Sequence, residues 1–332
     1  MIKIKKILIW STLSILTIII IFLIAYLAMP AKEKIENPVW GVTFTPRFAK
    51  ELGIDWQKSF ILMLDDLNFR HFRLAVYWDE VESKKGTFDF GELDWLINEI
   101  EKRNGSVILT IGRKNLRWPE CYQPAWIKEM ADDQIEQRLY EMIRETINHF
   151  KDRKSIYLWQ VENEPFFSFG ECPAPKSRVI EAEVALVRSL DNRPIMLTDS
   201  GELSTWLKTI KYPDILGITM YRDVSNPWTG DFHWPSPAGW YSKRAKLAER
   251  RVDKVIVAEL QMEPWYNQPF TSVEPDEQAA KFNIDKMKDN IDFAKKAGFS
   301  EYYLWGAEWW FYMEKNGHNE YLEHIKSLNK KQ

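Results

Sequence analysis

Two glutamates, Glu164 and Glu259, each follow a run of largely apolar residues. A charge beside such a run is costly to bury, so each glutamate needs a compensating partner or a chemical purpose. Hydrolysis of a glycoside gives one, because it uses one carboxylic acid to protonate the leaving oxygen and a second carboxylate to attack the anomeric carbon. Two independent ion pairs are the alternative, so the interpretation depends on whether both glutamates lie at one site.

The chain around these glutamates alternates between short β-branched or aromatic runs and longer amphipathic stretches, in eight repeats. Strands are predicted near residues 39–44, 71–77, 106–111, 156–162, 194–198, 214–219, 253–259 and 301–306. Helices are predicted near residues 55–67, 92–103, 134–150, 177–190, 202–211, 241–251 and 277–296, with a last one following. The series predicts an α/β fold, a (β/α)₈ TIM barrel. A doubly wound open sheet is disfavoured because no GxGxxG follows the first strand and no P-loop occurs.

A barrel of this kind carries its active site at the carboxyl ends of its strands. Glu164 ends the fourth predicted strand and Glu259 the seventh, so the two can face each other across a cleft. Arg73, Tyr221 and Trp305 lie on or at the ends of the second, sixth and eighth strands, which favours one site over independent ion pairs. We expect Glu164 to be protonated and Glu259 to be ionised beside Arg73. A separation of ~5–5.5 Å between the carboxyl groups would give retention of anomeric configuration and one of ~6.5–9.5 Å inversion, and we predict retention.

Three other glutamates could be confused with this pair. Glu162 precedes the first member by two residues, Glu263 follows the second by four, and Glu308 follows the eighth strand. Strand parity alone does not exclude Glu162. Glu308 is expected to be an ordinary loop charge.

The tripeptide Asn163-Glu164-Pro165 resembles the Asn-Glu-Pro signature of the clan A glycoside hydrolases, which include the cellulase-like family 5 and the β-galactosidase families 35 and 42. The likeness in strand order covers essentially the whole chain after its N-terminal segment. It implies that Glu164 is the general acid/base, that Glu259 is the nucleophile and that Asn163 binds the sugar 2-hydroxyl.

The same resemblance implies supporting roles for four further residues. Arg73 is similar to the arginine that keeps the nucleophile ionised, and Tyr221 to the tyrosine that hydrogen-bonds to it. Trp305 looks like the tryptophan that floors the subsite for the bond being cut. Trp78 opens a segment similar to a W-x3-E, G-x-F-D-F, L-D pattern found after strand 2, and is counted as substrate-binding or supporting. The acids of that segment are expected to be structural.

The N-terminal part of the chain has a different composition. Residues 7–29 carry no charge, a length that can cross the ~30 Å hydrocarbon core as a helix, and three lysines precede them. We therefore expect a cytoplasmic stub over 1–6, a transmembrane signal-anchor over 7–29 in the lipid bilayer, a linker over 30–37 and an extracytoplasmic catalytic barrel over 38–332. The alternative is a cleaved signal peptide and a secreted enzyme.

Composition and spacing limit the cofactors and partners. After residue 31 the chain is mildly acidic, which argues against nucleic acid. The five histidines form no HExxH or other metal motif, so no metal and no cofactor are expected. Cys121 and Cys172 follow strands 3 and 4, and they either form a disulfide between neighbouring loops or are free thiols. His233 is expected to have a surface or structural role.

The expected partner is a β-linked oligo- or polysaccharide, because loop tryptophans can stack on the apolar faces of sugar rings. A barrel acting on phosphorylated metabolites is disfavoured because the loops after strands 7 and 8 lack the glycine-rich phosphate pattern. A non-catalytic carbohydrate-binding barrel and a transglycosylase remain open alternatives. Cellulose, mannan, xylan and galactosides are all compatible with the sequence.

Overall fold

A computed structural model describes residues 2–27, 29–30, 35, 37–173, 175–226 and 230–329. Within them, eight parallel strands close into a barrel in the order β1-β10-β9-β6-β5-β4-β3-β2. The strands are β1 Val39–Thr43, β2 His71–Ala75, β3 Ser106–Ile111, β4 Ile156–Val161, β5 Ile195–Asp199, β6 Ile215–Met220, β9 Lys254–Gln261 and β10 Glu301–Trp305. The (β/α)₈ prediction is confirmed, and every predicted strand is present within two residues at each end.

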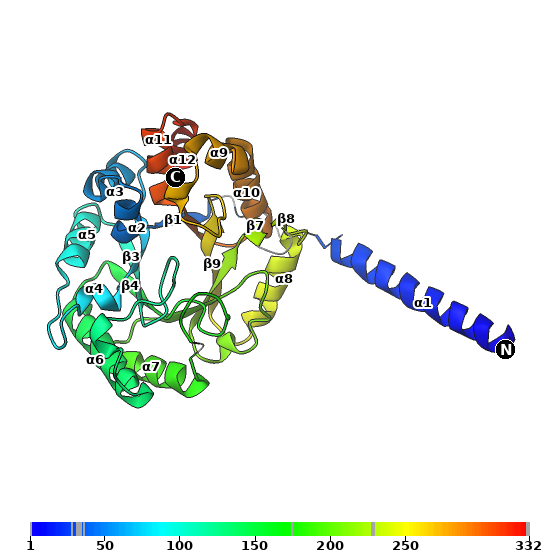
Figure 1. The fold of residues 1–332 in the computed structure, drawn as a ribbon, viewed down its shortest axis with the longest axis horizontal. Helices are drawn as coiled ribbons and strands as arrows, with labels where there is room; N and C mark the ends of the chain where they lie inside the picture. Colours follow the sequence, from blue (N-terminus) through cyan, green and yellow to red (C-terminus); the bar gives the residue numbers. More distant parts are fainter. Residues whose placement is uncertain are drawn as a thin grey trace.

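Helices surround this barrel on its outer face (Figure 1). The longer ones are α3 Trp56–Asp65, α5 Gly91–Glu101, α6 Asp132–Phe150, α7 Ser177–Leu190, α8 Ala238–Ala248, α10 Ile284–Ala297, α11 Ala307–Lys315 and α12 Glu320–Asn329. Shorter turns are α2 Pro46–Glu51, α4 Trp78–Val81, α9 Pro275–Lys281 and the 3₁₀ segments η1 Ala125–Ile127, η2 Thr209–Lys211 and η3 Phe270–Ser272. Most of the predicted helices are therefore present.

Two helix predictions are wrong in detail. The segment 202–211 forms only the turn η2, because serine side chains there bind the backbone: Ser200 Oγ accepts from Leu203 N and Ser204 Oγ from Trp206 N. The segment 277–296 is split into α9 and α10. Asn283 starts the second of these by accepting a hydrogen bond from Lys286 N, as an N-cap does.

One pair of strands was not predicted. The loop after β6 carries the antiparallel strands β7 (Asp223–Asn226) and β8 (Gly230–His233), which pair with each other outside the barrel. His233 lies there with its side chain more than half exposed and in contact with Arg222 and Asp223. A surface role for this histidine fits that position.

Two sets of buried side chains hold the strands in place. A small cluster contains Ile108, Leu158, Met196, Ile256, Ala258 and Tyr303, all from barrel strands. A much larger cluster joins the strands to the surrounding helices. Burial of such apolar surface is the main favourable term in folding, so the barrel is a packed scaffold that can hold side chains at its mouth.

Helix α1 (Ile2–Leu27) extends away from the barrel (Figure 1), and its last turn contacts α8 and the segment just before it. Tyr26 Oη donates to Ser236 Oγ at 2.9 Å, and its ring packs edge-on against Trp240. The membrane-spanning helix predicted over 7–29 is not supported, because no helix among the described residues is both long and apolar enough to cross a bilayer. Position 28 and most of the predicted linker 30–37 lie outside the described residues.

Candidate active site

Glu259 lies near the end of β9 and is held from two sides. Its side chain is nearly buried, at 4% exposure. Arg73 Nη1 donates to Glu259 Oε1 at 2.9 Å, and Tyr221 Oη donates to Glu259 Oε2 at 3.0 Å. A buried carboxylate that accepts hydrogen bonds at both oxygens and faces a guanidinium is stabilised in its charged form. The structure thus brings together three of the residues singled out in the sequence.

Arg73 is completely buried on β2 and binds side chains at the ends of two other strands, β4 and β9. Besides Glu259, it donates from Nε to Gln160 Oε1 at 2.8 Å and from Nη2 to Asn163 Oδ1 at 2.8 Å. The planar guanidinium has donors in fixed directions, so one side chain can set the relative positions of several acceptors. Arg73 therefore fixes the end of β4 relative to the end of β9.

Asn163 links Arg73 to the other glutamate, Glu164, through Thr198. Its Oδ1 also accepts from Thr198 Oγ1 at 3.1 Å, and Thr198 Oγ1 in turn accepts from the backbone N–H of Glu164 at 2.8 Å. Hydrogen bonds therefore connect the two glutamates through Arg73, Asn163 and Thr198. Thr198, on β5, was not singled out from the sequence.

Glu164 has a very different environment. It is 6% exposed, and its Oε1 is buried without a hydrogen-bond partner among the described residues. Burial, the charge of Glu120 and the charge of Glu259 raise the pKa of Glu164 well above its usual range, although Lys114 opposes them. The backbone φ of Glu164 is +44°, a conformation that non-glycine residues adopt at a cost of order 1–3 kcal/mol and mostly at functional sites. A carboxyl group held neutral at neutral pH can act as a proton donor.

A lysine and a glutamate that the sequence analysis missed lie beside Glu164. Lys114 Nζ donates to the carbonyl oxygens of Glu164 and Phe167, each at 3.0 Å, and lies 3.3 Å from Glu120 Oε2. Burial, followed by the charge of Glu259, raises the pKa of Glu120 to about 8, and Lys114 lowers it. Both residues follow β3, where the barrel rule places site residues, but no motif distinguished them from other loop charges.

These residues belong to a structured hairpin, Arg113–Tyr122, which we call the β3 hairpin. Backbone hydrogen bonds pair Arg113 with Tyr122 and Asn115 with Glu120. A disulfide between Cys121 and Cys172, with an S–S distance of 2.15 Å, ties the hairpin to the loop after β4. The structure thus joins the two cysteines for which the sequence allowed pairing, and the link runs between the loops that carry Glu120 and Glu164.

The hairpin tip carries Arg117 across the barrel mouth. Arg117 forms ion pairs with both Glu263 and Glu308. Its guanidinium lies 4.3 Å from the ring centroid of Trp305 and 4.0 Å from that of Phe48. Trp305 is therefore at the mouth, as its strand position predicted, but a guanidinium covers its ring.

The other candidate glutamates are accounted for by structural contacts. Glu162 accepts from the backbone N–H of Arg113 at 2.7 Å and of Lys114 at 2.5 Å, so it anchors the β3 hairpin. Gly112, with φ +128°, makes room for this carboxylate, since a Cβ there would lie 2.6 Å from Glu162 Cδ. Glu308 accepts from the N–H and hydroxyl of Thr45 as well as from Arg117, so it is a buried network residue and not the ordinary loop charge that we expected.

Trp78 does not line the mouth. It is completely buried in α4, where its Nε1 donates to Glu82 Oε2 at 2.8 Å and its ring packs edge-on against Trp126. Glu82 also accepts from Gly86 N and forms an ion pair with Arg138. Of the two roles counted for Trp78, only the supporting one agrees with this position, and a direct contact with substrate does not.

A row of aromatic side chains leads from the nucleophile to the surface. Tyr221 packs edge-on against Trp265 at 5.2 Å between ring centroids, Trp265 lies 5.6 Å from Phe169, and Phe169 lies 5.7 Å from Trp118. Trp118, at the tip of the β3 hairpin, is 61% exposed. Apolar ring faces of this kind can stack on the C–H faces of sugars.

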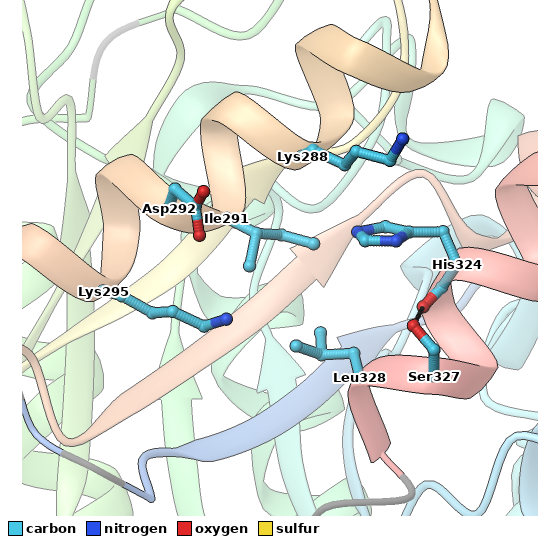
Figure 2. A pocket seen from close by; sticks show the side chains of 7 residues that line it. All are labelled: Lys288, Ile291, Asp292, Lys295, His324, Ser327 and Leu328. Atoms are coloured by element: carbon cyan, nitrogen blue, oxygen red, sulfur yellow. Dashed lines mark hydrogen bonds between the residues drawn. The ribbon is translucent and has the colours of Figure 1, made fainter.

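A separate hollow of about 280 Å³ lies between α10 and α12 and includes none of these residues (Figure 2). It is lined by Lys288, Ile291, Asp292, Lys295, His324, Ser327 and Leu328. Among the described residues, no group of three or more His, Cys, Asp or Glu side chains is arranged to hold a metal ion.

Comparison with known proteins agrees with this geometry. Residues 65–178 match the model of glycosyl hydrolase family 10. Over 278 residues, the chain is 24% identical to a β-1,4-xylanase from Dictyoglomus thermophilum, covering 78% of this chain and 75% of the xylanase.

Solved structures with the same fold include two that differ in reported activity. The exo-β-1,4-mannosidase Op5Man5 from Opitutaceae bacterium strain TAV5 is 14% identical with a TM-score of 0.57, over 84% of this chain. This chain spans only 54% of that mannosidase. A psychrophilic family 10 endo-β-1,4-xylanase is 15% identical with a TM-score of 0.53, over 81% of this chain and 86% of its own. Taken with the closed barrel, the family 10 match and the xylanase relative support a glycoside hydrolase of clan A, the clan of retaining β-glycosidases, and the solved structures show the shared fold.

Proposed function

We propose that the enzyme hydrolyses β-1,4-linked oligosaccharides of the xylan or mannan type, with Glu164 as acid/base and Glu259 as nucleophile. The observation that carries the assignment of roles is the asymmetry between two equally buried carboxyl groups. Glu259 accepts hydrogen bonds from Arg73 and Tyr221, whereas Glu164 has no partner at Oε1 within the described part of the chain and has a raised pKa. Environments that separate two carboxyl groups in this way assign one as acid and the other as base or nucleophile.

The reaction follows from this difference in two steps. In the first, a Glu259 oxygen attacks the anomeric carbon while Glu164 gives its proton to the departing glycosidic oxygen, leaving a covalent glycosyl-enzyme. Glu164 is then ionised and takes a proton from a water molecule that attacks the same carbon. The bond to Glu259 breaks, the sugar leaves with its original configuration, and Glu164 is protonated again.

Arg73 and Tyr221 act by holding the nucleophile. Their hydrogen bonds leave the Glu259 carboxylate only a narrow choice of orientations, and fixed donors cost no reorganisation when the charge on Glu259 changes during attack. The guanidinium of Arg73 also keeps Asn163 in place beside Glu164. Asn163, with its Oδ1 engaged by Arg73 and Thr198, is oriented for the contact to the sugar 2-hydroxyl that the clan resemblance implies.

The choice of sugar rests on the relatives and on the aromatic row. The curated relative is a β-1,4-xylanase, and the structural neighbours include β-1,4-xylanases and a β-1,4-mannosidase. Trp118, Phe169 and Trp265 offer apolar ring faces suited to neutral pyranose rings.

We further propose that the N-terminal segment anchors the enzyme to the outer face of the membrane. This proposal rests on the sequence, in which residues 7–29 carry no charge and three lysines precede them. It does not rest on the fold, because no helix among the described residues is long and apolar enough to cross a bilayer. Carbonate-resistant retention of the full chain in a membrane fraction is expected. Full release of the chain by carbonate, or a mature N-terminus near residue 32, would refute anchoring.

The test of the enzymatic proposal is a panel of aryl β-xylosides, β-mannosides, β-glucosides and β-galactosides, together with xylo- and manno-oligosaccharides, given to the full-length chain. Hydrolysis of a xyloside or mannoside is expected, and proton NMR of the first product should show the β-anomer. An α-anomer as first product would overturn the double displacement. Binding of oligosaccharides without turnover would favour the carbohydrate-binding alternative, and products longer than the substrate without free sugar would favour a transglycosylase.

A further inference from the structure

The β3 hairpin is fixed on several sides, so the position of its tip is part of the site. Tyr77 Oη donates to the carbonyl of Leu116 at 3.0 Å, and Asn115 Nδ2 donates to that of Val76 at 2.8 Å, which ties the hairpin to the end of β2. Tyr122 Oη donates to the carbonyl of Arg117 at 2.9 Å, within the hairpin itself. The Cys121–Cys172 disulfide ties the other side to the loop after β4.

From this fixed base, Arg117 reaches the opposite side of the barrel mouth. Its ion-pair partners follow β9 and β10, and Glu308 is itself bound by Thr45, which follows β1. The guanidinium lies between the rings of Phe48 and Trp305 and is 8% exposed. Since β1 and β10 are neighbours in the closed barrel, the side chain of Arg117 fills the sector of the mouth that they border.

The chemistry of the two glutamates assigns that sector to one side of the scissile bond. The leaving sugar departs past the acid, Glu164 on the β4 side, and the sugar that becomes bonded to the enzyme lies against the nucleophile, Glu259 on β9. Arg117 closes the mouth beyond β9, next to Glu263 and Trp305. A polysaccharide that continues past the glycone sugar would have to pass the position that Arg117 occupies between Phe48 and Trp305.

We infer that Arg117 limits the glycone side to a single sugar, so that the enzyme removes one residue at a time from the non-reducing end. This inference rests on the proposed function. The sugar is a neutral one, because the two carboxylates of Glu263 and Glu308 outnumber the guanidinium and give a uronic acid no excess positive charge to bind. Such hydroxyl-rich terminal sugars suit a cluster in which carboxylate acceptors predominate.

The wild-type enzyme provides the first test. Reducing-end-labelled xylohexaose and mannohexaose are given to the full-length chain, each with a free or a chemically blocked non-reducing end. Loss of one sugar at a time from the free substrate, and no cleavage of the blocked one, is expected. Internal cleavage of the blocked substrate would overturn the inference. A parallel aryl β-glycoside assay keeps the two proposals apart: turnover there supports the proposed function whichever pattern the hexamers give, and its absence with every substrate refutes that function.

A variant identifies Arg117 as the residue responsible. Arg117→Ala should make the blocked hexamer a substrate, with internal products rising at least tenfold over wild type. Arg178→Ala, which breaks an exposed ion pair with Glu136 on the barrel exterior, should leave the product pattern unchanged. An Arg117→Ala protein that folds, as judged by circular dichroism, and still rejects the blocked substrate would show that Arg117 does not close the groove. If that variant does not fold, the blocked-substrate assay on the wild type still decides whether the glycone side holds one sugar.

Discussion

The ends of β4 and β9 carry chemically identical side chains in almost equally buried positions, yet their surroundings differ. At the end of β9, Glu259 meets a guanidinium and a phenol, one at each oxygen. At the end of β4, Glu164 is held through its backbone by Thr198 and Lys114, while its carboxyl faces Glu120 and Glu259. Two carboxyl groups buried to a similar degree therefore differ here in their hydrogen-bond donors and in the charges beside them.

The largest expected effect comes from removing the two carboxyl groups. Glu164→Gln should lower kcat/KM on oligosaccharides by about 10²–10⁴-fold, the usual share of general acid–base catalysis. Glu259→Gln should cost on the order of 10³-fold or more, because no covalent intermediate can form. The two losses should differ in their dependence on the leaving group. A dinitrophenyl leaving group needs no proton, so its release by Glu164→Gln should be much less impaired, whereas Glu259→Gln should remain inactive.

Single-turnover kinetics with dinitrophenyl and unactivated aryl glycosides measures this difference. Equal losses for both leaving groups in Glu164→Gln would mean that Glu164 is not the acid. Substantial hydrolysis by Glu259→Gln would exclude that residue as nucleophile and make Glu263 the next candidate.

The second prediction concerns Arg73, which donates a hydrogen bond to Glu259 on β9. Arg73→Lys keeps the positive charge but cannot reach Glu259, Gln160 and Asn163 together, because an ammonium lacks the planar set of donors. We expect a loss of about 10²-fold in kcat with a folded protein, similar to the removal of one preorganised donor. Arg103→Lys, at an exposed ion pair with Asp65, is the matched control and should keep full activity. Unchanged kcat in Arg73→Lys would show that charge alone suffices at the nucleophile.

Sequence reasoning located these two strand ends correctly because strands read as short apolar runs, and a polar residue that ends such a run is conspicuous. Arg73, Tyr221 and Trp305 were found by the same rule. Lys114, Arg117 and Glu120 were missed, since they lie in a hairpin whose shape depends on hydrogen bonds to β2 and on the disulfide. Trp78 was assigned from a motif, but a motif does not reveal whether an indole faces the mouth or the core.

The third prediction tests whether Glu120 helps to raise the pKa of Glu164 at the end of β4. Glu120 has a pKa of about 8, and above that pH its negative charge raises the pKa of Glu164, so Glu120→Gln should lower the pKa of the acid. The basic limb of the kcat/KM profile should then move to lower pH, because the enzyme is active only while Glu164 is protonated. Activity below that limb should change by less than about tenfold, since Glu120 does not take part in bond breaking.

The pH profile of Glu171→Gln is the control for this experiment, because Glu171 is an exposed glutamate next to the disulfide. It should match the wild-type profile. A basic limb that stays in place in Glu120→Gln, or one that moves to higher pH, would contradict the role given to Glu120. In that case burial and the charge of Glu259 would have to account for the protonated acid.

The smallest expected effect is on the pH dependence of folding stability. It concerns Glu183 of α7, which is completely buried against Glu162. Burial, followed by the charge of Glu162, raises the pKa of Glu183 well above its usual range, and burial raises the pKa of Glu162 to about 7. A folded-state pKa above the unfolded value means that the folded protein holds its proton more tightly. The stability from this group is complete below about pH 4.5 and is lost as pH rises through the folded pKa.

Glu183→Gln removes that titration and keeps the shape of the side chain. Urea unfolding should therefore give similar stabilities for variant and wild type near pH 5, with the variant more stable by on the order of 1 kcal/mol at pH 8. Glu181→Gln, on the exposed face of the same helix, should follow the wild type at both pH values. Parallel pH dependences for Glu183→Gln and wild type would mean that Glu183 is already ionised in the folded protein. The β4 side of the barrel would then tolerate a buried charge beside Glu162.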